Sequence, residues 1–361
     1  MAERDEGHQP WSRWGSYLSD RQWGTVREDY SADGNAWSSF PHEHARMRCY
    51  RWGEDGLLGI SDEKGLLCFG LALWNGRDPI LKERPFGLAN GEGNHGEDLK
   101  DYFFHLLNTP THSFMRGLYK YPQQEFPYQH LVEENGRRGR DQPEYELVET
   151  GIFDDNRYFD VFVDYAKASP EDLLIRIRVV NRGAEEAELS LIPTLWLRNL
   201  WDWGYKEDWR QRSPICRDGD GIKTPDIHGI GSYQLACRQQ GTWLFTENAT
   251  NTERLYQQPN SQPYVKDAFH RYLVDGDQDA VNPAQEGTKA GLLLQQRIAG
   301  GGEWVVDLRL ARQLSADPFD ASFDQLLQQR EQECLDYFDS CAPGLSADDA
   351  LIFRSAASGL L

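Results

Sequence analysis

Apolar and polar residues alternate through the middle of the chain, and this pattern predicts β-strands. The apolar face of residues 158–165 consists of Phe159, Val161, Val163 and Tyr165, opposite Asp160 and Asp164. The same alternation runs through residues 173–180 and 189–197. Turn residues at 169–172 and 181–183 separate these stretches. The pattern therefore predicts an antiparallel meander with one buried face, and several such units predict a large β-sandwich.

Other stretches fit the same class of fold. Residues 56–74 read as two strands around a turn at 62–65, and residues 291–298 and 304–310 read as a late hairpin joined by three glycines. Residues 84–127 are rich in Tyr, Phe, His, Asn and Gly, which favours long loops between strands. The expected fold is mainly β.

The hydrophobic period changes near residue 315 from two to about 3.6, which predicts a helix to about Ser340. Residues 342–344 (Ala-Pro-Gly) break that helix, and Ser346 then offers an N-cap for another. The second helix carries an apolar stripe made of Leu351, Ile352, Ala356 and Leu360. Because the chain stops at Leu361 with no C-terminal signal, we expect a truncation within this helix and a partly uncovered stripe.

Composition excludes several classes of protein. The 39% apolar and 12% aromatic content excludes general disorder, and 361 residues leave room for about two domains. A net charge of −20 argues against nucleic-acid binding, because no basic face could neutralise phosphates. The acidic N-terminus lacks the apolar run of a signal peptide, and no segment reaches the ~18 apolar residues of a membrane span. Six scattered cysteines indicate reduced thiols, so we expect a cytoplasmic protein.

Aromatic rings and charges are concentrated in residues 11–55. Six of the twelve tryptophans precede residue 80, and Trp14 and Trp52 each directly follow an arginine. A regular apolar core has little use for such a mixture. Flat rings beside fixed charges suit a polyhydroxylated ligand, because the ring stacks on CH groups while the charges bind hydroxyls. A second aromatic cluster, Trp196, Trp201, Trp203 and Trp209, could line a sugar subsite or cover a sandwich edge.

Several long strings together resemble the N-terminal part of bacterial family 63 glycoside hydrolases, which include mannosyl-oligosaccharide glucosidases and related α-glucosidases. The strings are Trp23-Gly24-Thr25-Val26-Arg27-Glu28-Asp29-Tyr30, Arg51-Trp52-Gly53-Glu54-Asp55-Gly56, Trp74-Asn75-Gly76, Lys82-Glu83-Arg84, Gly93-Asn94-His95-Gly96-Glu97-Asp98 and Pro193-Thr194-Leu195-Trp196. The resemblance extends from about Trp14 to Leu361.

The resemblance implies a layout in three parts. Residues 1–314 would form a β-supersandwich, 315–345 a helical linker, and 346–361 the first helix of an α/α-toroid catalytic domain. Such enzymes invert the anomeric centre with a carboxylic acid and a carboxylate roughly 6.5–9.5 Å apart. Both groups are expected in the toroid, so this chain would brace the catalytic domain and border its pocket without supplying the catalytic carboxylates.

The candidate substrate-binding residues lie on the loops that carry these strings. They are Trp23, Arg27, Glu28, Asp29, His42, His44, Arg51, Trp52, Asn94, His95, Glu97 and Asp98. Two of the sets have a structural alternative. Glu28 and Asp29 could instead form an ion-pair network with Arg27 or Arg51, and the loop at 93–98 could make an interdomain contact.

Metal and cofactor motifs are weak. His42 and His44 could share one face of a strand, but no third ligand follows at a recognisable spacing. The spacing of Asp275, Asp277 and Asp279 matches the first ligands of a calcium-binding loop, but the later ligands of such a loop are missing. A solvated turn is therefore expected. We expect no metal, no cofactor, no nucleic acid and no membrane, with an oligosaccharide as the partner. The oligomeric state stays open, and a stand-alone carbohydrate-binding module or a small complete hydrolase are the alternative functions.

Overall fold

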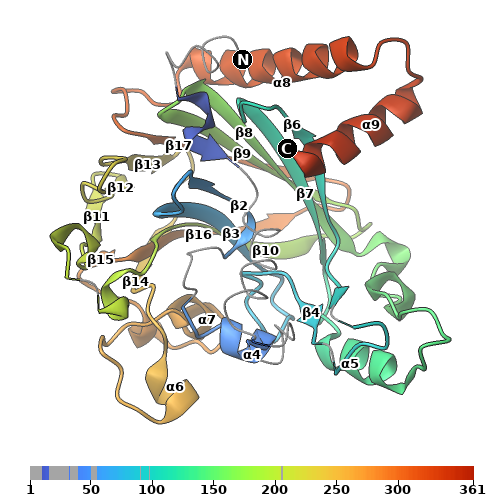
Figure 1. Cartoon of the computed structure of the whole chain (residues 1–361), viewed down its shortest axis with the longest axis horizontal. Coiled ribbons are helices and arrows are strands. Elements are labelled where there is room, and N and C mark those ends of the chain that lie inside the picture. Colours follow the sequence, from blue (N-terminus) through green and yellow to red (C-terminus); the bar gives the residue numbers. More distant parts are fainter. Residues whose placement is uncertain are drawn as a thin grey trace.

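The computed structural model describes residues 10–15, 32, 40–49, 55–89, 91–96, 98–204 and 206–361, and its core is a sandwich of two antiparallel sheets (Figure 1). The smaller sheet has six strands. In spatial order they are β1 (Trp14–Gly15), β2 (Leu57–Asp62), β3 (Leu67–Trp74), β10 (Ala187–Leu197), β16 (Lys289–Ile298) and β14 (Thr242–Thr246). The mainly β sandwich expected from the sequence is confirmed.

The larger sheet has nine strands. In spatial order they are β15 (Glu286–Gly287), β11 (Ile215–Asp218), β12 (Gly221–Lys223), β13 (Gln234–Cys237), β17 (Glu303–Ala311), β9 (Asp172–Asn181), β8 (Tyr158–Ser169), β7 (Phe114–Pro122) and β6 (Phe103–Asn108). A separate small ribbon pairs β4 (Gly87–Leu88) with β5 (Asp98–Leu99). Short 3-10 turns join the strands at Trp11–Arg13, Leu147–Thr150, Asp154–Asn156, Trp201–Trp203, Asp208–Arg210 and Gln278–Ala280.

The main core lies between the two sheets. Phe159, Val161, Val163 and Tyr165 of β8 all point into it, as their alternation predicted. They meet residues of the smaller sheet such as Phe69, whose ring packs edge-on against Tyr165 with centroids 6.1 Å apart. Edge-on packing of two rings adds to the stabilisation that burial already provides.

Helices cover the outer faces of both sheets. Figure 1 shows α8 (Ala321–Cys341) and α9 (Ala347–Leu360) along the larger sheet, and α4 (His42–Ala45), α6 (Thr252–Tyr256) and α7 (Ala268–Leu273) at the opposite end. The buried face of α8 packs on outward residues of β6 to β9. This second apolar cluster contains Leu107, Phe114, Ala166, Leu174, Phe323, Leu327, Cys334 and Phe338. A third cluster joins α7 to the smaller sheet through Phe269 and Ile192.

Two arginines of the larger sheet connect it to α8. Arg116 contacts Asp164 on the neighbouring strand and Glu331 on the helix, at 2.6 Å each. Arg176 reaches Asp307 at 2.7 Å and Asp324 on the helix at 2.6 Å. Because each guanidinium bridges a strand carboxylate and a helix carboxylate, the contacts fix the position of α8 on the sheet as well as adding to its stability.

Helix α5 (Tyr128–Arg137) belongs to an excursion that packs beside the sandwich. Its buried Leu131 joins Phe86, Leu88, Phe126, Leu147 and Ile152 in a satellite cluster. Arg137 is the last residue of this helix, and three of the four residues at 137–140 are exposed.

Three expectations about connections are wrong. Residues 84–127 are not only loops, because β6 and β7 form a hairpin there. Residues 291–298 and 304–310 do not pair, since β16 lies between β10 and β14 while β17 lies between β13 and β9. The meander also ends at residue 181, where the chain crosses from β9 to the other sheet. Strand β7 is buried over most of both faces, and the chain changes sheets after β9 and between β16 and β17, neither of which alternation specifies.

The two C-terminal helices begin and end close to the predicted positions. Asp320 caps α8, and the Ser346 hydroxyl accepts a hydrogen bond from the Asp349 N–H at 3.2 Å. Of the stripe on α9, Ile352 is 62% exposed and Leu360 is 90% exposed. The stripe is therefore uncovered, as expected. Among the helices that the structure describes, none combines the length and apolar character needed to cross a bilayer.

We expect the uncovered stripe of α9 to drive self-association, because each exposed apolar side chain gains roughly 1.5–3 kcal/mol when it is buried. The double substitution Ile352→Lys and Leu360→Lys should lower the associated fraction in light scattering at high protein concentration. Gln325→Lys with Gln328→Lys adds the same charge on the exposed face of α8 and should leave association unchanged. A monodisperse wild-type monomer would contradict this prediction.

Candidate functional site

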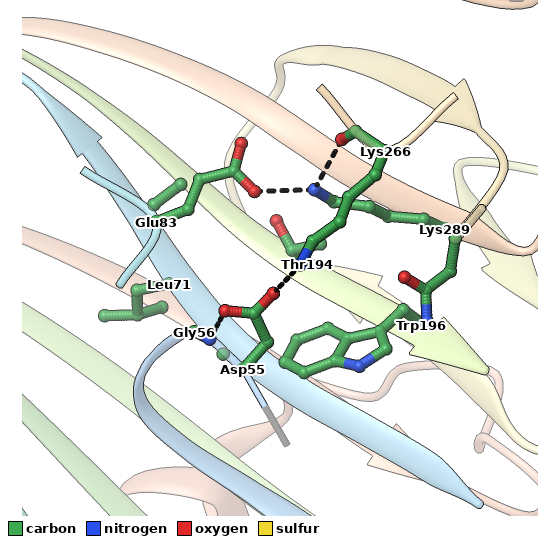
Figure 2. Close-up of a pocket in the computed structure, with 11 residues that line it drawn as sticks. Asp55, Gly56, Leu71, Glu83, Thr194, Trp196, Lys266 and Lys289 are labelled. Carbon is green, nitrogen blue, oxygen red and sulfur yellow. Dashed lines mark hydrogen bonds and ion pairs between the residues drawn. The ribbon is translucent and has the colours of Figure 1, made fainter. Parts of the chain in front are cut away.

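Figure 2 shows a small charged pocket, whose Lys266 contacts the last residue of α4. Its walls come from both sides of the smaller sheet and from the loops around it. The lining residues are Asp55, Gly56, Gly70, Leu71, Ala72, Glu83, Thr194, Trp196, Asn248, Lys266 and Lys289. Asp55 and Gly56 precede β2, Thr194 and Trp196 end β10, and Lys289 begins β16. Segments distant in sequence thus meet because four neighbouring strands, β2, β3, β10 and β16, carry them to one place.

Two buried ion pairs dominate the pocket. Lys266 Nζ lies 2.6 Å from Asp55 Oδ2, and Lys289 Nζ lies 2.6 Å from Glu83 Oε2. The lysine side chains are only 4% and 6% exposed. Burial lowers the pKa of Lys266, and the Asp55 carboxylate opposes that shift. Removing either partner would leave an uncompensated charge away from water.

Lys266 also connects the pocket to the N-terminal segment. Its ammonium donates to the carbonyls of Ala45 and Arg48 at 3.0 and 2.8 Å, in addition to Asp55. All three of its N–H groups are therefore used. Its own carbonyl accepts from Lys289 Nζ at 3.3 Å, which joins the two ion pairs. This lysine fixes the turn at α4 on the sandwich.

Trp196 forms the aromatic wall of the pocket. Its ring lies against Gly56 and Gly70, where an added Cβ would come within 3.1 and 3.2 Å of the indole. Gly56 also has a φ of +86°, a conformation that other residues rarely adopt. The two glycines therefore allow the strands and the indole to approach closely. Asn248 completes the wall and donates to the Leu197 carbonyl at 2.9 Å.

The enclosed space is about 20 Å³, which holds about one water molecule. Both carboxylates of the pocket contact lysines, so they do not form the separated acid and base that inversion requires. The pocket as it stands can hold a bridging water and present one aromatic face, but it cannot enclose a hexose.

Seven of the predicted site residues lie outside the described part of the chain. They are Trp23, Arg27, Glu28, Asp29, Arg51, Trp52 and Glu97. The other five are His42, His44, Asn94, His95 and Asp98. None of these five lines the pocket, but four of them contact the excursion that carries α5 or lie beside its acidic residues.

His42 packs among aromatic rings rather than on a strand. Residues 42–45 form the single helical turn α4, which corrects the strand geometry considered for His42 and His44. The His42 ring stacks on Tyr128 at a centroid distance of 5.6 Å and meets the edge of Phe86 at 5.2 Å. Burial lowers the pKa of His42, and the nearby Arg84, Lys82 and Arg46 lower it further. His42 is therefore neutral over the physiological range.

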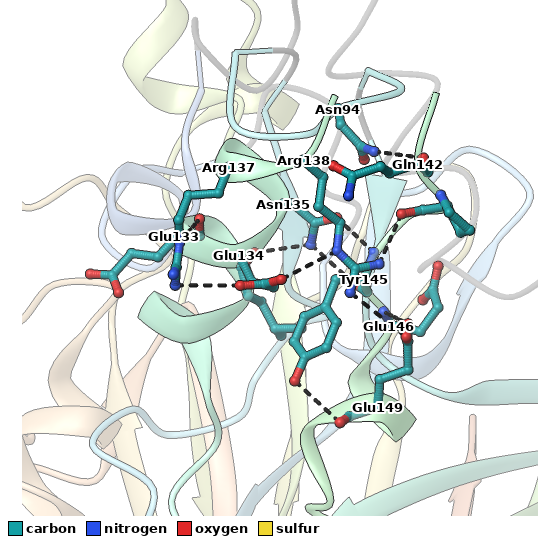
Figure 3. A network of polar contacts seen from close by, with 12 residues as sticks. Asn94, Glu133, Glu134, Asn135, Arg137, Arg138, Gln142, Tyr145, Glu146 and Glu149 are labelled. Atoms are coloured by element: carbon teal, nitrogen blue, oxygen red, sulfur yellow. Dashed lines mark hydrogen bonds and ion pairs between the residues drawn. The ribbon is translucent and has the colours of Figure 1, made fainter. Parts of the chain in front are cut away.

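Asn94 and His95 hold the loop that follows α5 (Figure 3). The Asn94 amide donates to the carbonyls of Gly139 and Gln142 at 3.1 and 3.0 Å, and His95 Nε2 lies 2.8 Å from the Gln142 carbonyl. The contact expected between domains is thus made to a neighbouring segment of the same chain. The polar groups of Asn94 and His95 are therefore used to hold this loop instead of a ligand.

Asp98 lies beside two further acids. Lys100 Nζ contacts Asp98 and lies 3.5 Å from Glu144 and 3.3 Å from Glu146. A hydrogen bond with Asp98 raises the pKa of Glu144. Although three carboxylates converge here, the Lys100 ammonium already acts as their counter-ion. The arrangement therefore favours a structural ion-pair cluster over a cation site.

Sequence reasoning found part of the pocket without recognising it as one site. Asp55, Gly56, Glu83, Thr194 and Trp196 belong to three of the strings that carry the family resemblance. Lys266, Lys289 and Asn248 were missed, because a single lysine or asparagine in a strand or loop has no signature. Only their burial identifies them, and burial follows from the tertiary fold.

The chain is similar in sequence to Uncharacterized protein YMR196W of Saccharomyces cerevisiae, with 40% identity over 397 residues. The alignment covers 97% of this chain and 36% of the yeast protein, so the chain spans about a third of that relative's length. No family model matches the chain.

Three solved structures are similar in part. A putative kojibiose phosphorylase from the human microbiome gives a TM-score of 0.27 at 9% identity, covering 84% of this chain and 32% of that one. A polysaccharide lyase gives a TM-score of 0.28 at 12% sequence identity, and the match covers 72% of this chain and 27% of the lyase chain. A putative aldose 1-epimerase of Escherichia coli K12 gives a TM-score of 0.24 at 10% sequence identity, and the match covers 57% of this chain and 67% of the epimerase chain. All three names concern sugars, but likenesses with TM-scores this low carry no argument about this chain.

Lys266→Met should destabilise the protein by about 3–5 kcal/mol, because Asp55 would remain buried without its partner. Adding Asp55→Asn should recover part of that loss. Lys206→Met, at an exposed position, should change the free energy of unfolding by no more than about 0.5 kcal/mol. Urea denaturation measures all of these changes. A Lys266→Met effect as small as that of Lys206→Met would show that the ion pair adds nothing.

The lowered pKa of His42 predicts that the folded protein loses stability in mild acid. Its pKa is lowered in the folded protein, so below about pH 6.5 the unfolded chain binds more protons and the free energy of unfolding falls. The slope is at most about 1.4 kcal/mol per pH unit for one histidine. His42→Phe keeps a ring beside Tyr128 and should flatten the fall between pH 7 and 5.5, whereas His130→Phe at an exposed site should not. Equal slopes in both variants would contradict the prediction.

Proposed function

We propose that the chain is the N-terminal portion of an inverting glycoside hydrolase that acts on α-glucosidic bonds of oligosaccharides. Its sandwich braces a helical catalytic domain, and the end that carries the charged pocket borders the substrate. The proposal rests chiefly on the meeting of three family-like strings in one buried cluster. It rests also on the resemblance that those strings carry.

The geometry supports a bordering role more than a catalytic one. Lys266 joins the pocket rigidly to α4, and one edge of the Trp196 ring packs against two adjacent glycines. Such a rigid arrangement holds the neighbouring loops in fixed positions beside a substrate. The predicted loop residues Trp23, Arg27, Glu28, Asp29, Arg51 and Trp52 belong to the same N-terminal stretch. We propose that they, with Glu97, contact the oligosaccharide.

The described carboxylates give no support to a complete hydrolase. Asp55 and Glu83 each contact a lysine, and Asp98 lies in the cluster around Lys100. An inverting enzyme needs an acid and a base roughly 6.5–9.5 Å apart with a water between them. We therefore assign the bond-breaking groups to the helical domain. The uncovered stripe on α9 offers an apolar face against which such a domain could pack.

Activity of the chain and of its longer relative separates the possibilities. The 361-residue chain should not hydrolyse α-linked gluco-oligosaccharides, whereas the full-length yeast relative should hydrolyse them with inversion of the anomer, which NMR detects directly. Robust hydrolysis by the chain alone would overturn the assignment of the carboxylates. Binding of the sugar by the chain, with no hydrolysis by the full-length relative, would favour the stand-alone binding module.

A further inference from the structure

An open groove lies at the other end of the strands that carry the charged pocket. It has a volume of about 830 Å³, within the range of small-molecule binding sites. The ends of β3, β7, β10 and β16 form its walls, together with the turn between β9 and β10. Its lining residues are Trp74, Asn75, Gly76, Arg77, Gln123, Gln124, Asp155, Arg157, Gly183, Ala184, Glu185, Glu186, Ala187, Glu188 and Arg297.

The groove is separate from the pocket. Lys289 and Arg297 lie eight residues apart on β16, with the lysine in the pocket and the arginine in the groove. Trp196 and Glu188 have the same spacing on β10. Eight residues of extended strand span about 26 Å on β10 and β16, whereas on β3 the pocket residue Ala72 and the groove residue Trp74 are two residues apart, so the two sites diverge from β3 and share no lining residue.

A buried asparagine fixes one wall of the groove. The Asn75 amide donates to the carbonyls of Pro122 and Gln124, both at 2.7 Å. Its oxygen accepts from the backbone N–H groups of Arg77 and Asp78. Every hydrogen-bonding position of the amide's N–H₂ and oxygen is thus occupied, and the turn after β3 is locked to the segment after β7.

A second buried asparagine fixes the opposite wall. Asn181 donates to the carbonyls of Glu185 and Ile298 at 2.8 and 2.9 Å and accepts from the Gly183 N–H at 2.9 Å. Gln123 Nε2 joins the walls by donating to Asn181 Oδ1 at 2.6 Å. The surface between these two walls, which is the floor of the groove, is therefore organised before any ligand arrives. This order lowers the entropic cost of binding.

The rim carries charges of both signs whose contacts are loose. Arg157 lies 3.8 Å from Asp155, and Arg297 lies 3.8 Å from Glu186 and 3.6 Å from Glu188. These separations exceed hydrogen-bonding distance, so the guanidinium donors and carboxylate acceptors can turn to a ligand. Arg297 is 71% exposed, which allows that movement. The rim has three arginines against Asp155, Glu185, Glu186 and Glu188, so it has no strong preference for an anion.

We propose that this groove binds a neutral oligosaccharide. Hydroxyls both donate and accept, and they therefore match a rim of mixed arginines and carboxylates. Trp74 supplies an indole whose edge is fixed, since its Nε1 donates to the Asp78 carbonyl at 2.9 Å. CH groups of a sugar ring can stack on such a surface. The class of ligand, an oligosaccharide, rests on the proposed function. Binding in the groove does not depend on which glycosidic bond is cleaved or on where cleavage takes place.

Calorimetric titration of the 361-residue chain with maltoheptaose tests the groove. Arg157→Ala with Arg297→Ala should weaken binding about tenfold, because two charged donors are lost. Arg137→Ala removes an exposed arginine from α5, outside the groove, and should leave the affinity unchanged. Circular dichroism should report the same fold for each variant. Because both substituted arginines are exposed on the rim, loss of folding is not expected.

Several outcomes would overturn the inference. They are the absence of maltoheptaose binding by the wild-type chain at millimolar concentration, equal affinities for the rim variant and Arg137→Ala, and tighter binding of a sulfated oligosaccharide than of maltoheptaose. Groove binding that survives while the full-length relative fails to hydrolyse α-glucosides would support the groove and reject the proposed hydrolase. The two proposals therefore fail separately.

Discussion

The central strands of the sandwich are covered on both faces, and the rest of the structure depends on this constraint. Inward residues of the two sheets form the main core, while α8 and α7 close the outer faces. Strand β3 is consequently buried along nearly its whole length, and so is most of β10. Polar side chains on these strands can remain only where partners are available, which confines charges to the strand ends.

The buried charges at the pocket follow from that confinement. Lys289 begins β16 and Glu83 follows the segment that pairs with β3, so their ion pair forms at the margin of the apolar layer. Lys266 uses its whole ammonium on two carbonyls and Asp55. A buried ion pair adds little net stability over apolar packing, but it penalises alternative arrangements of the chain. Its effect here is to fix where α4 and the start of β2 lie.

The two ends of the same strands thus have different characters. The charged pocket is small, has Trp196 as one wall, and is rigid through its ion pairs. The groove at the opposite end is open, with a floor fixed by Asn75 and Asn181 and a rim of loosely paired charges. The first arrangement suits the support of neighbouring loops. The second suits reversible contact with a polar ligand, because its floor needs no rearrangement and its rim can adapt.

Sequence alone determined the strands whose two faces differ in polarity. Residues 158–165 and 173–180 alternate because their outer faces carry arginines and aspartates that form ion pairs across the sheet, and Arg176 also reaches α8. The caps of α8 and α9 are equally local, since Asp320 and Ser346 bond N–H groups two and three residues away. The family-like strings contain five of the pocket residues, although none of the predicted site residues that the structure describes lines the pocket.

Only the tertiary structure decided which strands pair. The three glycines at 300–302 could close a hairpin, but β16 and β17 join different sheets because each finds apolar partners there. Lys266, Lys289, Asn75 and Asn181 acquire their roles by the same route. A polar side chain becomes a fixed part of a site when the fold removes it from water and supplies its partners, and both conditions depend on residues distant in the sequence.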